Sequence, residues 1–464
     1  MANKNIGAVE EITAMQASDT VLVETGGSLK RVSPATLNGV LGQQSLIESS
    51  SYGIEFDTAV SSPACTRIGN ATMHRTLPVQ SAMRGCLLGD DGTVQKYLPS
   101  GSWASEKRDG TAGQVMVEIP EHWRKCETDG TKRRVLIAET ALPGFTRVPK
   151  MYVSAYEAAA DRTNNKLCSV VNAAAQFRGG NNDADKDGTS ASFLGKPATS
   201  LTRTQFRTYA RARKAGSTEW NLYTYDCHKA LFWLFAVEYA TLDSQAAFNA
   251  EPTAEGYRQG GLGAGVTMLV GAKWNAFNGY YPVIPCGYTD ELGNGTGVKE
   301  YTMPSEYSAD GVKVSVPRYR GIENPFGHVW KIVDGLNASF DKNDGILRSH
   351  TCQDPAKFSD TGHDGYGYVG DMARTQGYVQ QIIFGAGGEI VPSVVGGAST
   401  QFFCDYFSLF RNLDSDQSYD VLGAAVGSNC DQGGKGGMCS QLLLSVLAVD
   451  PGNGTRLCFI PAAM

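Results

Sequence analysis

Residues 320–335, with the sequence RGIENPFGHVWKIVDG, form the most specific stretch of this chain. Asn324 and Pro325 are adjacent residues that favour a turn, and Gly327 can adopt backbone angles that other residues avoid. Trp330 follows three positions later and is large enough to anchor a core. The stretch therefore predicts a tight loop beside a large buried anchor.

The composition around this stretch is that of a globular, loop-rich protein. The chain has 464 residues, which is too long for one ordinary core and favours roughly three units of about 100 to 200 residues. Hydrophobic residues make up 42% and charged residues 19% of the chain, as in folded proteins. Because 54 residues are glycine, we expect many turns and irregular connections. The expected class is α+β, with loops dominating.

Charge and hydropathy exclude several classes of partner. The formal net charge is −6, whereas a nucleic-acid binder needs a basic patch that releases counterions. The basic runs at 132–134 and 203–214 are short, and we expect them on a solvated hairpin edge or helix face. The chain has no run of about 18 apolar residues and no apolar segment typical of a signal peptide near Met1. We expect no nucleic-acid partner, no membrane insertion and no secretion through a signal peptide.

Residues that could carry chemistry do not gather into a motif. Asp183, Asp185 and Asp187 begin like a calcium loop, but Leu194 occupies the position of the bidentate Glu, so a solvated loop is expected. The six histidines are isolated from one another, and the glycines at 261–265 lack the Lys-Ser/Thr of a phosphate loop. The 11 cysteines include no CxxC pair, which favours reduced thiols. We expect no enzyme activity, no metal and no other cofactor.

Three segments are expected along the chain. Residues 1–50 contain too little apolar material for a core, and we interpret them as a virion-attachment or oligomerisation segment with a strand at 20–24 and a short helix from Ser33. Residues 51–110 are dense in turn signals and predict a small β-rich connector. A larger domain is expected over 111–464.

Within the larger domain, a hairpin and two helices are predicted. Residues 114–119 and 134–137 are strand-like and flank an Asp-Gly turn. Thr202 is expected to cap a helix that ends near Lys214, and Asp226 a longer helix through about Tyr239. The second helix is apolar nearly all round and should be buried. After Asn249 we expect strands and loops.

The C-terminal residues 401–447 have the composition of a binding surface. They interleave Phe, Tyr, Asp, Asn, Gln, Ser and Gly without a helical or strand period, and they contain almost no Lys or Glu. Aromatic side chains supply contact area at low entropic cost, while Ser, Gly and Asn supply adaptable hydrogen bonds. The segments 390–397 and 455–461 on either side look constrained, so we expect a fixed framework that presents this surface.

The most specific stretch also carries a family resemblance. Asn324, Gly327, Trp330 and Asp334 form an Asn-x-x-Gly-x-x-Trp-x-x-x-Asp pattern that resembles the formylglycine-generating-enzyme-like branch of the C-type lectin fold. Together with residues 152–157 and 454–459, the chain is similar to the variable proteins of diversity-generating retroelements, in the version found on tail fibres of phages of gut Bacteroidales. The resemblance covers about residues 50–464. Residues 394–400, followed by 404–406, look like the start of a variable region over about 399–457.

The resemblance implies a receptor-binding protein whose lectin-like domain is diversified by error-prone reverse transcription of adenines. It implies a variable surface drawn from two sets of residues. These residues are Gln401, Phe403, Asp405, Ser408, Phe410, Asn412, Asp414, Gln417 and Tyr419, and then Asn429, Asp431, Gln432, Lys435, Met438, Ser440, Gln441, Leu443 and Ser445.

Two considerations restrict this set. Phe403, Phe410 and Leu443 are equally consistent with buried strand residues. Adenine changes in an Asn-type codon do not produce Gln, Lys or Met, so the residues of these three types in the set are either fixed or descend from other codons. They are Gln401, Gln417, Gln432, Gln441, Lys435 and Met438.

The implied partners and location follow from the tail-fibre resemblance. The partner would be a receptor on the host bacterial surface, either protein or polysaccharide. Residues 1–50 would join other tail proteins of the virion, after assembly in the host cytoplasm. A homotrimer is implied by analogy with tail fibres, and it would strengthen weak single-site binding through avidity.

Two alternatives remain open at this point. A formylglycine-generating type of oxidase would need Cys430 and Cys439 as a reactive pair, although their surroundings do not reproduce the motif of those enzymes. A calcium-dependent glycan-binding lectin would need the loop at Asp183, which is incomplete.

Overall fold

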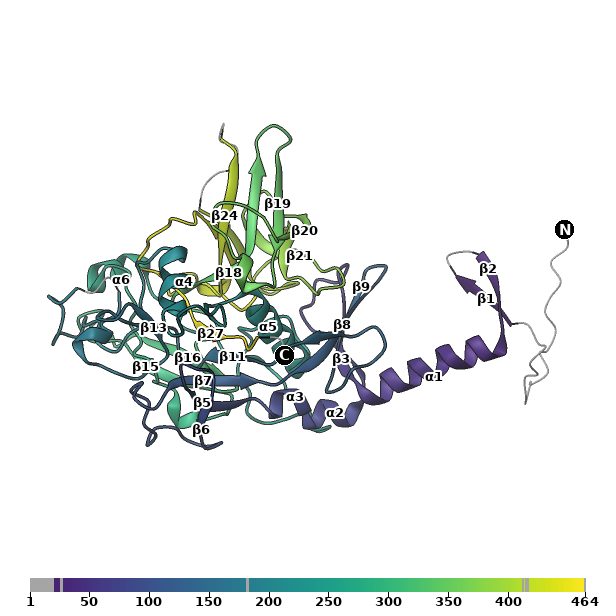
Figure 1. The fold of residues 1–464 in the computed structure, drawn as a ribbon, viewed down its shortest axis with the longest axis horizontal. Helices are drawn as coiled ribbons and strands as arrows, with labels where there is room; N and C mark the ends of the chain where they lie inside the picture. Colours follow the sequence, from purple (N-terminus) through teal and green to yellow (C-terminus); the bar gives the residue numbers. More distant parts are fainter. Residues whose placement is uncertain (1–20, 26–27, 181–182, 411–412, 414–416, 463–464) are drawn as a thin grey trace.

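A computed structural model describes residues 21–25, 28–180, 183–410, 413 and 417–462. The described chain is mixed α/β, rich in strands, and contains few helices. Figure 1 shows one long helix, α1, extending away from a body in which strands and the remaining helices pack together. The α+β expectation therefore agrees with the structure at the level of a mixed, strand-rich protein.

The N-terminal part consists of a hairpin followed by this helix. Strand β1 (Val21–Thr25) pairs with β2 (Ser28–Val32), and α1 spans Pro34–Ser50. The Ser33 hydroxyl caps α1 by accepting the Thr36 N–H at 3.2 Å, which confirms the predicted helix start. The helix has 17 residues and is longer than predicted.

Two sheets join residues 52–110 to the rest of the body. In one sheet, β3 (Tyr52–Asp57) pairs with β9 (Lys132–Ala138); in the other, β5 (Arg84–Leu88) pairs with β7 (Gln114–Ile119). Residues 52–110 therefore do not form a sheet of their own, because their strands pair with strands that follow position 110. The order of the first sheet is β10-β8-β9-β3-β4, with bounds Thr146–Val148, His122–Asp129, Lys132–Ala138, Tyr52–Asp57 and Thr66–Gly69. The second is β14-β27-β11-β7-β5-β6, with bounds Trp220–Leu222, Leu457–Phe459, Met151–Ser154, Gln114–Ile119, Arg84–Leu88 and Val94–Tyr97.

The predicted hairpin turn is correct, but its first strand is not. Asp129 faces Lys132 across the turn, and the strand that pairs with β9 is β8 rather than residues 114–119. The latter form β7, which is buried along its whole length between β5 and β11. A strand that is buried on both faces shows no alternation of apolar and polar residues, so the sequence pattern did not show which strands it pairs with.

The body contains two long helices and several short ones. Helix α4 (Arg203–Arg211) has the predicted Thr202 cap, and Gln205 completes a capping box. Helix α5 (Tyr225–Tyr239) is buried almost all round as predicted, but its cap is Thr224 rather than Asp226. The short helices are α2 (Ala71–Thr76), α3 (Pro78–Ser81) and α6 (Gly271–Asn278), with 3-10 turns η1 (Ala175–Phe177), η2 (Asp290–Leu292), η3 (Pro355–Lys357) and η4 (Gly433–Lys435). Helix α6 lies after Asn249, where only strands and loops were predicted.

The C-terminal half builds a curved nine-stranded sheet that nearly closes on itself. A Cβ placed on Gly370 in β20 would lie 3.0 Å from the Cδ1 of Ile383 in β21, so strands far apart in the sheet order approach each other. The path is β20-β19-β18-β24-β25-β23-β21-β22, with β26 paired to β18. The bounds in that order are Gly367–Asp371, Ile346–Thr351, Trp330–Asp341, Tyr419–Val426, Gln441–Leu444, Tyr406–Leu409, Gly377–Ile383 and Val391–Val395, then Asn453–Gly454 for β26.

Smaller pairings complete the fold, and one large core runs through it. This core joins residues from Tyr52 to Cys458, including the buried face of α5. Because residues before and after position 110 share it, the predicted domain boundary near 110 does not separate two cores. The smaller pairings are β12 (Ala159–Asp161) with β13 (Lys166–Cys168), and β15 (Gly297–Thr302) with β16 (Lys313–Tyr319) and β17 (Ile322–Glu323).

Candidate binding surface

The stretch 320–335 forms a tight loop that leads into β18. Asn324 and Gly327 have φ angles of +46° and +75°, so both occupy the left-handed region. A Cβ on Gly327 would lie 3.0 Å from the backbone N and O of Val266, which explains the glycine. Trp330 begins β18 and is 6% exposed, which confirms the predicted buried anchor. The buried Arg456 guanidinium donates to the carbonyl oxygen of Asn324 at 2.5 Å and ties the end of the chain to this loop.

A buried charged group lies directly behind the loop. His328 Nε2 accepts the N–H groups of Val283 and Ile284, each at 3.0 Å, so its Nδ1 carries the proton and donates to Glu157. The Lys331 ammonium lies 2.8 Å from the other carboxylate oxygen of Glu157. Burial opposes ionisation of Glu157, but Lys331 and His328 outweigh it and lower the pKa of the Glu157 carboxyl to about 2. These side chains are partners of one another and serve the loop structurally.

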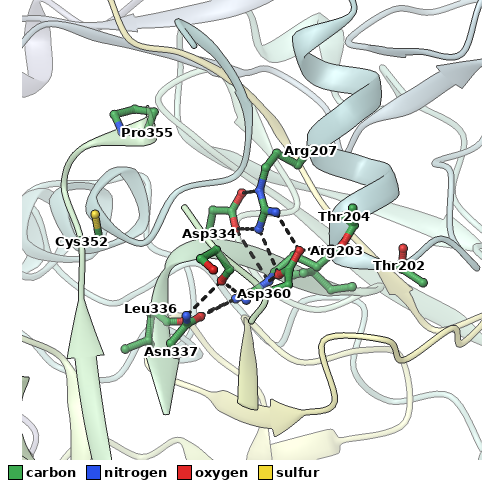
Figure 2. Close-up of polar contacts among 12 residues, drawn as sticks. Thr202, Arg203, Thr204, Arg207, Asp334, Leu336, Asn337, Cys352, Pro355 and Asp360 are labelled. Atoms are coloured by element: carbon green, nitrogen blue, oxygen red, sulfur yellow. Dashed lines mark hydrogen bonds and ion pairs between the residues drawn. The ribbon is translucent and has the colours of Figure 1, made fainter. Parts of the chain in front are cut away.

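Asp334, the last residue of the motif, joins β18 to α4 through a network of ion pairs (Figure 2). The Arg207 guanidinium contacts both Asp334 oxygens, with Nε to Oδ2 at 2.7 Å and Nη2 to Oδ1 at 2.6 Å. Arg207 Nη1 also lies 2.7 Å from Asp360 Oδ2, and Arg203 Nε lies 2.5 Å from Asp360 Oδ1. Arg203 further donates to the Asn337 side-chain oxygen at 2.8 Å. We call Arg203, Arg207, Asp334 and Asp360 the ion-pair frame.

The frame corrects the prediction for the basic run at 203–214. Arg203, Arg207 and Arg213 are buried, not solvated, and Arg213 Nη1 lies 3.1 Å from the Asp90 carboxylate. The spacing of the arginines is typical of a solvated helix face. Their acidic partners lie far away in the sequence, so the local pattern does not reveal them. Bidentate Arg–carboxylate pairs are the geometry in which buried charges are tolerated.

The candidate variable residues divide by exposure. The exposed ones are Gln401, Phe410, Gln417, Asp431 and Lys435, and the partly exposed ones are Ser408, Tyr419, Asn429, Gln432 and Ser445. Six are buried, namely Phe403, Asp405, Met438, Ser440, Gln441 and Leu443. Asn412 and Asp414 lie outside the described residues. Asp405, Met438, Ser440 and Gln441 are therefore not on the exposed surface, while for Phe403 and Leu443 the alternative of a buried residue applies.

Each of the buried polar candidates has a structural contact that explains its position. Asp405 Oδ2 accepts the Cys439 N–H at 2.6 Å. Gln441 donates to the Ile390 carbonyl oxygen at 2.7 Å, and the Ser440 hydroxyl donates to the Lys435 carbonyl oxygen at 2.8 Å. These side chains hold the segments on which the exposed candidates lie.

The buried apolar candidates belong to the core. Phe403 packs edge-on against Phe56 with ring centroids 5.9 Å apart, and Met438 and Leu443 join the same cluster. The alternative of buried strand residues, given above for Phe403 and Leu443, is therefore the correct one. Phe410 differs, because it is 38% exposed.

One group of exposed candidates lies where β24 begins, beside the turn between β18 and β19. Gln417 precedes β24 and Tyr419 begins it, whereas the Phe410 N–H donates to the Leu443 carbonyl oxygen at 3.1 Å, farther along the sheet. The Lys342 N–H in the turn after β18 donates to the Ser418 hydroxyl at 3.0 Å, so the two arms meet here. Figure 1 shows β19 and β24 projecting together from the body. We call residues 341–346 and 417–420 the tip.

The other group lies on a loop packed against the segment before α6. The Gly433 N–H donates to the Thr267 carbonyl oxygen at 2.5 Å, and the Leu269 N–H donates to the Cys430 carbonyl oxygen at 2.8 Å. A Cβ on Gly434 would lie 3.3 Å from the Cβ of Ser399, which brings residues 399–401 alongside. The Lys435 ammonium lies 4.6 Å from the centre of the Tyr406 ring. We call residues 399–401 and 431–435 the loop surface.

Two exposed residues next to the loop surface were missed by sequence reasoning. Met268 and Val270 are 61% and 56% exposed. They belong to an apolar run at 266–270 that favours burial, and Val266 and Leu269 in that run are indeed buried. Only the backbone pairing with residues 430–433 places Met268 and Val270 beside the candidates, and no local pattern could have indicated this.

The two cysteines required by the oxidase alternative are not accessible. Cys430 and Cys439 are fully buried and have free thiols. Burial raises the pKa of both thiols well above the ordinary value, which disfavours the thiolate that a reactive cysteine needs. The Cys430 thiol donates to the His328 carbonyl oxygen at 3.1 Å, and Cys439 belongs to a different apolar cluster. This arrangement offers no exposed thiol pair to a substrate.

Two of the three aspartates of the calcium-like loop, Asp183 and Asp187, have partners within the protein. Asp187 pairs with Arg178, and Asp183 Oδ1 accepts the Asp185 N–H at 3.0 Å. Within the described ranges, no three His, Cys, Asp or Glu side chains are grouped so that they could hold a metal ion. None of the helices in that same part of the chain is long and apolar enough to cross a membrane.

A scan against models of known protein families found no match to this chain, and a search of curated proteins found none either. The functional proposal therefore depends on the sequence pattern and on the geometry described above.

Proposed function

We propose that this protein is a receptor-binding subunit of a phage tail fibre, with a C-type-lectin-like C-terminal domain of the retroelement-diversified type. Its loop surface and tip would bind a receptor on the host cell, and the bound partner would change as these positions vary. The proposal assigns no catalysis and no cofactor to the chain. Its location would be the virion, after assembly in the cytoplasm of the bacterial host.

One observation carries this proposal: the exposed candidates lie on loops whose supporting residues are buried and hydrogen-bonded to the backbone. Asp405, Ser440 and Gln441 hold the loop backbone through hydrogen bonds of 2.6 to 2.8 Å. Asp431 and Lys435 point outward from the same segment and belong to the exposed class. The exposed side chains can therefore change while the hydrogen bonds of the buried side chains remain in place. This is the arrangement that a diversified binding surface needs.

The chemistry of the exposed side chains supports binding rather than a reaction. Gln401, Gln417, Asp431 and Lys435 offer hydrogen bonds and charge of both signs, and Phe410 offers an aromatic ring. Such mixtures suit adaptable recognition, in which rigid backbone and varied side chains meet a partner of matching shape.

The N-terminal helix supports the attachment role proposed for residues 1–50. Helix α1 leaves the body as a single helix (Figure 1), and Leu41 and Leu46 on it are 56% and 45% exposed. Exposed aliphatic side chains on an isolated helix favour packing with other helices. We propose that further copies of this chain, as a homotrimer, and other tail proteins meet here.

Binding of the purified protein to a panel of Bacteroidales cells tests the proposed function. The informative variant exchanges three exposed candidates, Gln401, Asp431 and Lys435, and the partly exposed Gln432 for the residues of a related variable protein. A matched variant exchanges two exposed polar residues of β6, Gln95 and Lys96, for other polar residues, because β6 lies in the second sheet and contributes to neither surface. A change of host strain with the first variant alone supports the proposal. Equal binding by the two variants contradicts it. The absence of binding by the parent chain and by both variants contradicts it as well.

A further inference from the structure

Two exposed aliphatic side chains form a constant part of the loop surface. Met268 and Val270 are separated by the buried Leu269, so the backbone turns both outward. Neither belongs to the candidate variable set, and both lie more than 100 residues before the predicted variable region of about 399–457. Their side chains therefore stay the same while the candidates beside them change.

Backbone contacts fix these two side chains relative to the loop. The Gly433 N–H to Thr267 oxygen bond and the Leu269 N–H to Cys430 oxygen bond, at 2.5 and 2.8 Å, flank Met268. A Cβ on Gly433 would lie 3.6 Å from the Met268 sulfur, which shows how closely the loop approaches it. Because these are backbone bonds, changes in the exposed loop side chains leave them intact.

The segment that carries the pair is rigid on its other side as well. The Tyr307 hydroxyl accepts the Val270 N–H at 2.9 Å, and Trp274 in α6 is buried beneath. Asp431 adjoins the start of α6, since a Cβ on Gly271 would lie 3.0 Å from its Oδ2. Met268 and Val270 thus lie in a polar surrounding that includes Asp431 and Lys435.

We propose that Met268 and Val270 form a fixed apolar contact within the receptor-binding surface and that the receptor is a protein of the host cell surface. This inference rests on the proposed function. Apolar side chains at the centre of a contact, surrounded by polar ones, are typical of protein–protein interfaces. Methionine is unbranched and adapts its shape, so one contact can serve receptors that differ in detail.

The aliphatic character of the pair favours a protein over a polysaccharide. Sugar rings present hydroxyl groups that must be hydrogen-bonded, and Met268 and Val270 offer no donor or acceptor of the required strength. The apolar faces of Leu, Val or aromatic side chains on a protein receptor would instead be buried against them. The polar candidates Asp431 and Lys435 would then select among receptors by charge.

Binding of the full chain to intact cells of a strain that it recognises tests this inference. The cells are treated with a protease, with periodate to destroy sugars, or with buffer alone. The variant Met268→Ser/Val270→Ser is compared with the conservative Met268→Leu/Val270→Ile, which keeps the apolar area. We expect protease but not periodate to abolish binding. We also expect the serine variant to bind about tenfold more weakly, and the conservative variant to bind like the parent.

A third variant, Asp431→Lys, separates the inference from the proposed function on which it rests. Loss of binding with Asp431→Lys together with full binding by the serine variant overturns the inference and leaves the proposed function standing. Loss of binding after periodate alone overturns the protein receptor in favour of a polysaccharide. Failure of the parent chain to bind any strain overturns both. Thermal unfolding of each variant confirms that the changes at these exposed positions leave the fold intact.

Discussion

The ion-pair frame and the loop surface both contain oppositely charged side chains, yet the protein uses those charges in different ways. In the frame, Asp334 is fully buried and each of its oxygens contacts Arg207. On the loop surface, Asp431 and Lys435 are exposed, and their neighbours are held by backbone bonds. Charge in the first region is structural, because the loss of one carboxylate leaves buried positive charge without full compensation. Charge in the second region is free to vary, so it can serve recognition.

The largest effect that separates the two regions is expected from Asp334→Ala. The change removes the bidentate partner of Arg207 and leaves two buried guanidinium groups, Arg203 and Arg207, with Asp360 as their one remaining carboxylate, so the free energy of unfolding should fall by about 3–5 kcal/mol. Urea denaturation followed by circular dichroism measures it. The matched surface change, Asp431→Ala, should lower the free energy of unfolding by less than about 0.5 kcal/mol. Similar losses for the two variants would mean that the frame does not carry structural charge.

The next effect tests the loop that positions the frame. Gly327→Ala places a Cβ 3.0 Å from the Val266 backbone at a φ of +75°, and we expect a loss of about 1–3 kcal/mol. Gly362→Ala is the control, because a Cβ at Gly362 meets nothing within 4 Å and its φ is not left-handed. Differential scanning calorimetry of both variants decides the point. An equal drop in Tm would assign the effect to chain entropy rather than to the tight loop.

A pH-dependent effect is expected at Asp405, the buried carboxylate that accepts the Cys439 N–H. Burial, with a smaller contribution from Asp243, raises the pKa of the Asp405 carboxyl well above its ordinary value. Since the folded pKa lies above the unfolded one, the stabilisation is complete below the unfolded pKa of about 3.9 and is lost as pH rises toward the folded pKa. Asp405→Asn removes this loss.

The measurement for Asp405 is urea denaturation of parent and variant between pH 4 and pH 8. The stability of Asp405→Asn relative to the parent should improve by about 1–2 kcal/mol across this range. A relative stability that stays constant with pH would show that Asp405 is ionised in the folded protein at every pH tested.

The smallest effect on stability is expected on the loop surface itself. Asp431→Ala with Lys435→Ala should change the free energy of unfolding by less than about 0.5 kcal/mol, because neither side chain has a buried partner. The same double variant should change binding to cells. A frame variant cannot test this, because its loss of binding could not be separated from unfolding. A destabilisation above about 1 kcal/mol would place this loop with the structural region.

Local signals in the sequence predicted local structure well. Ser33 and Thr202 begin helices as their capping chemistry indicates, and the Asp-Gly turn joins two strands. Trp330 is buried as its size suggests. The contacts that decide the caps and the turn lie within a few residues along the chain, whereas the burial of Trp330 follows from its residue type.

Non-local contacts explain what sequence reasoning did not predict. The arginines of α4 find their carboxylates more than 120 residues away, so their burial left no mark on the local pattern. Thr224 rather than Asp226 caps α5, although both are suitable types. Phe403 and Leu443 lie in a segment with the composition of a surface, but their side chains are buried in the core. Of the predicted surface residues that the structure describes, ten are exposed or partly exposed and six are buried.

Helix α1 has a mechanical consequence for the body that it carries. With 17 residues at about 1.5 Å each, it separates the N-terminal hairpin from the body by roughly 25 Å. Each residue added to it would lengthen this spacing by only about 1.5 Å but would rotate the body by about 100° around the helix axis. The length of α1 thus sets the direction in which the loop surface faces far more sharply than it sets the reach, and insertions of seven residues would restore the original direction within about 20°.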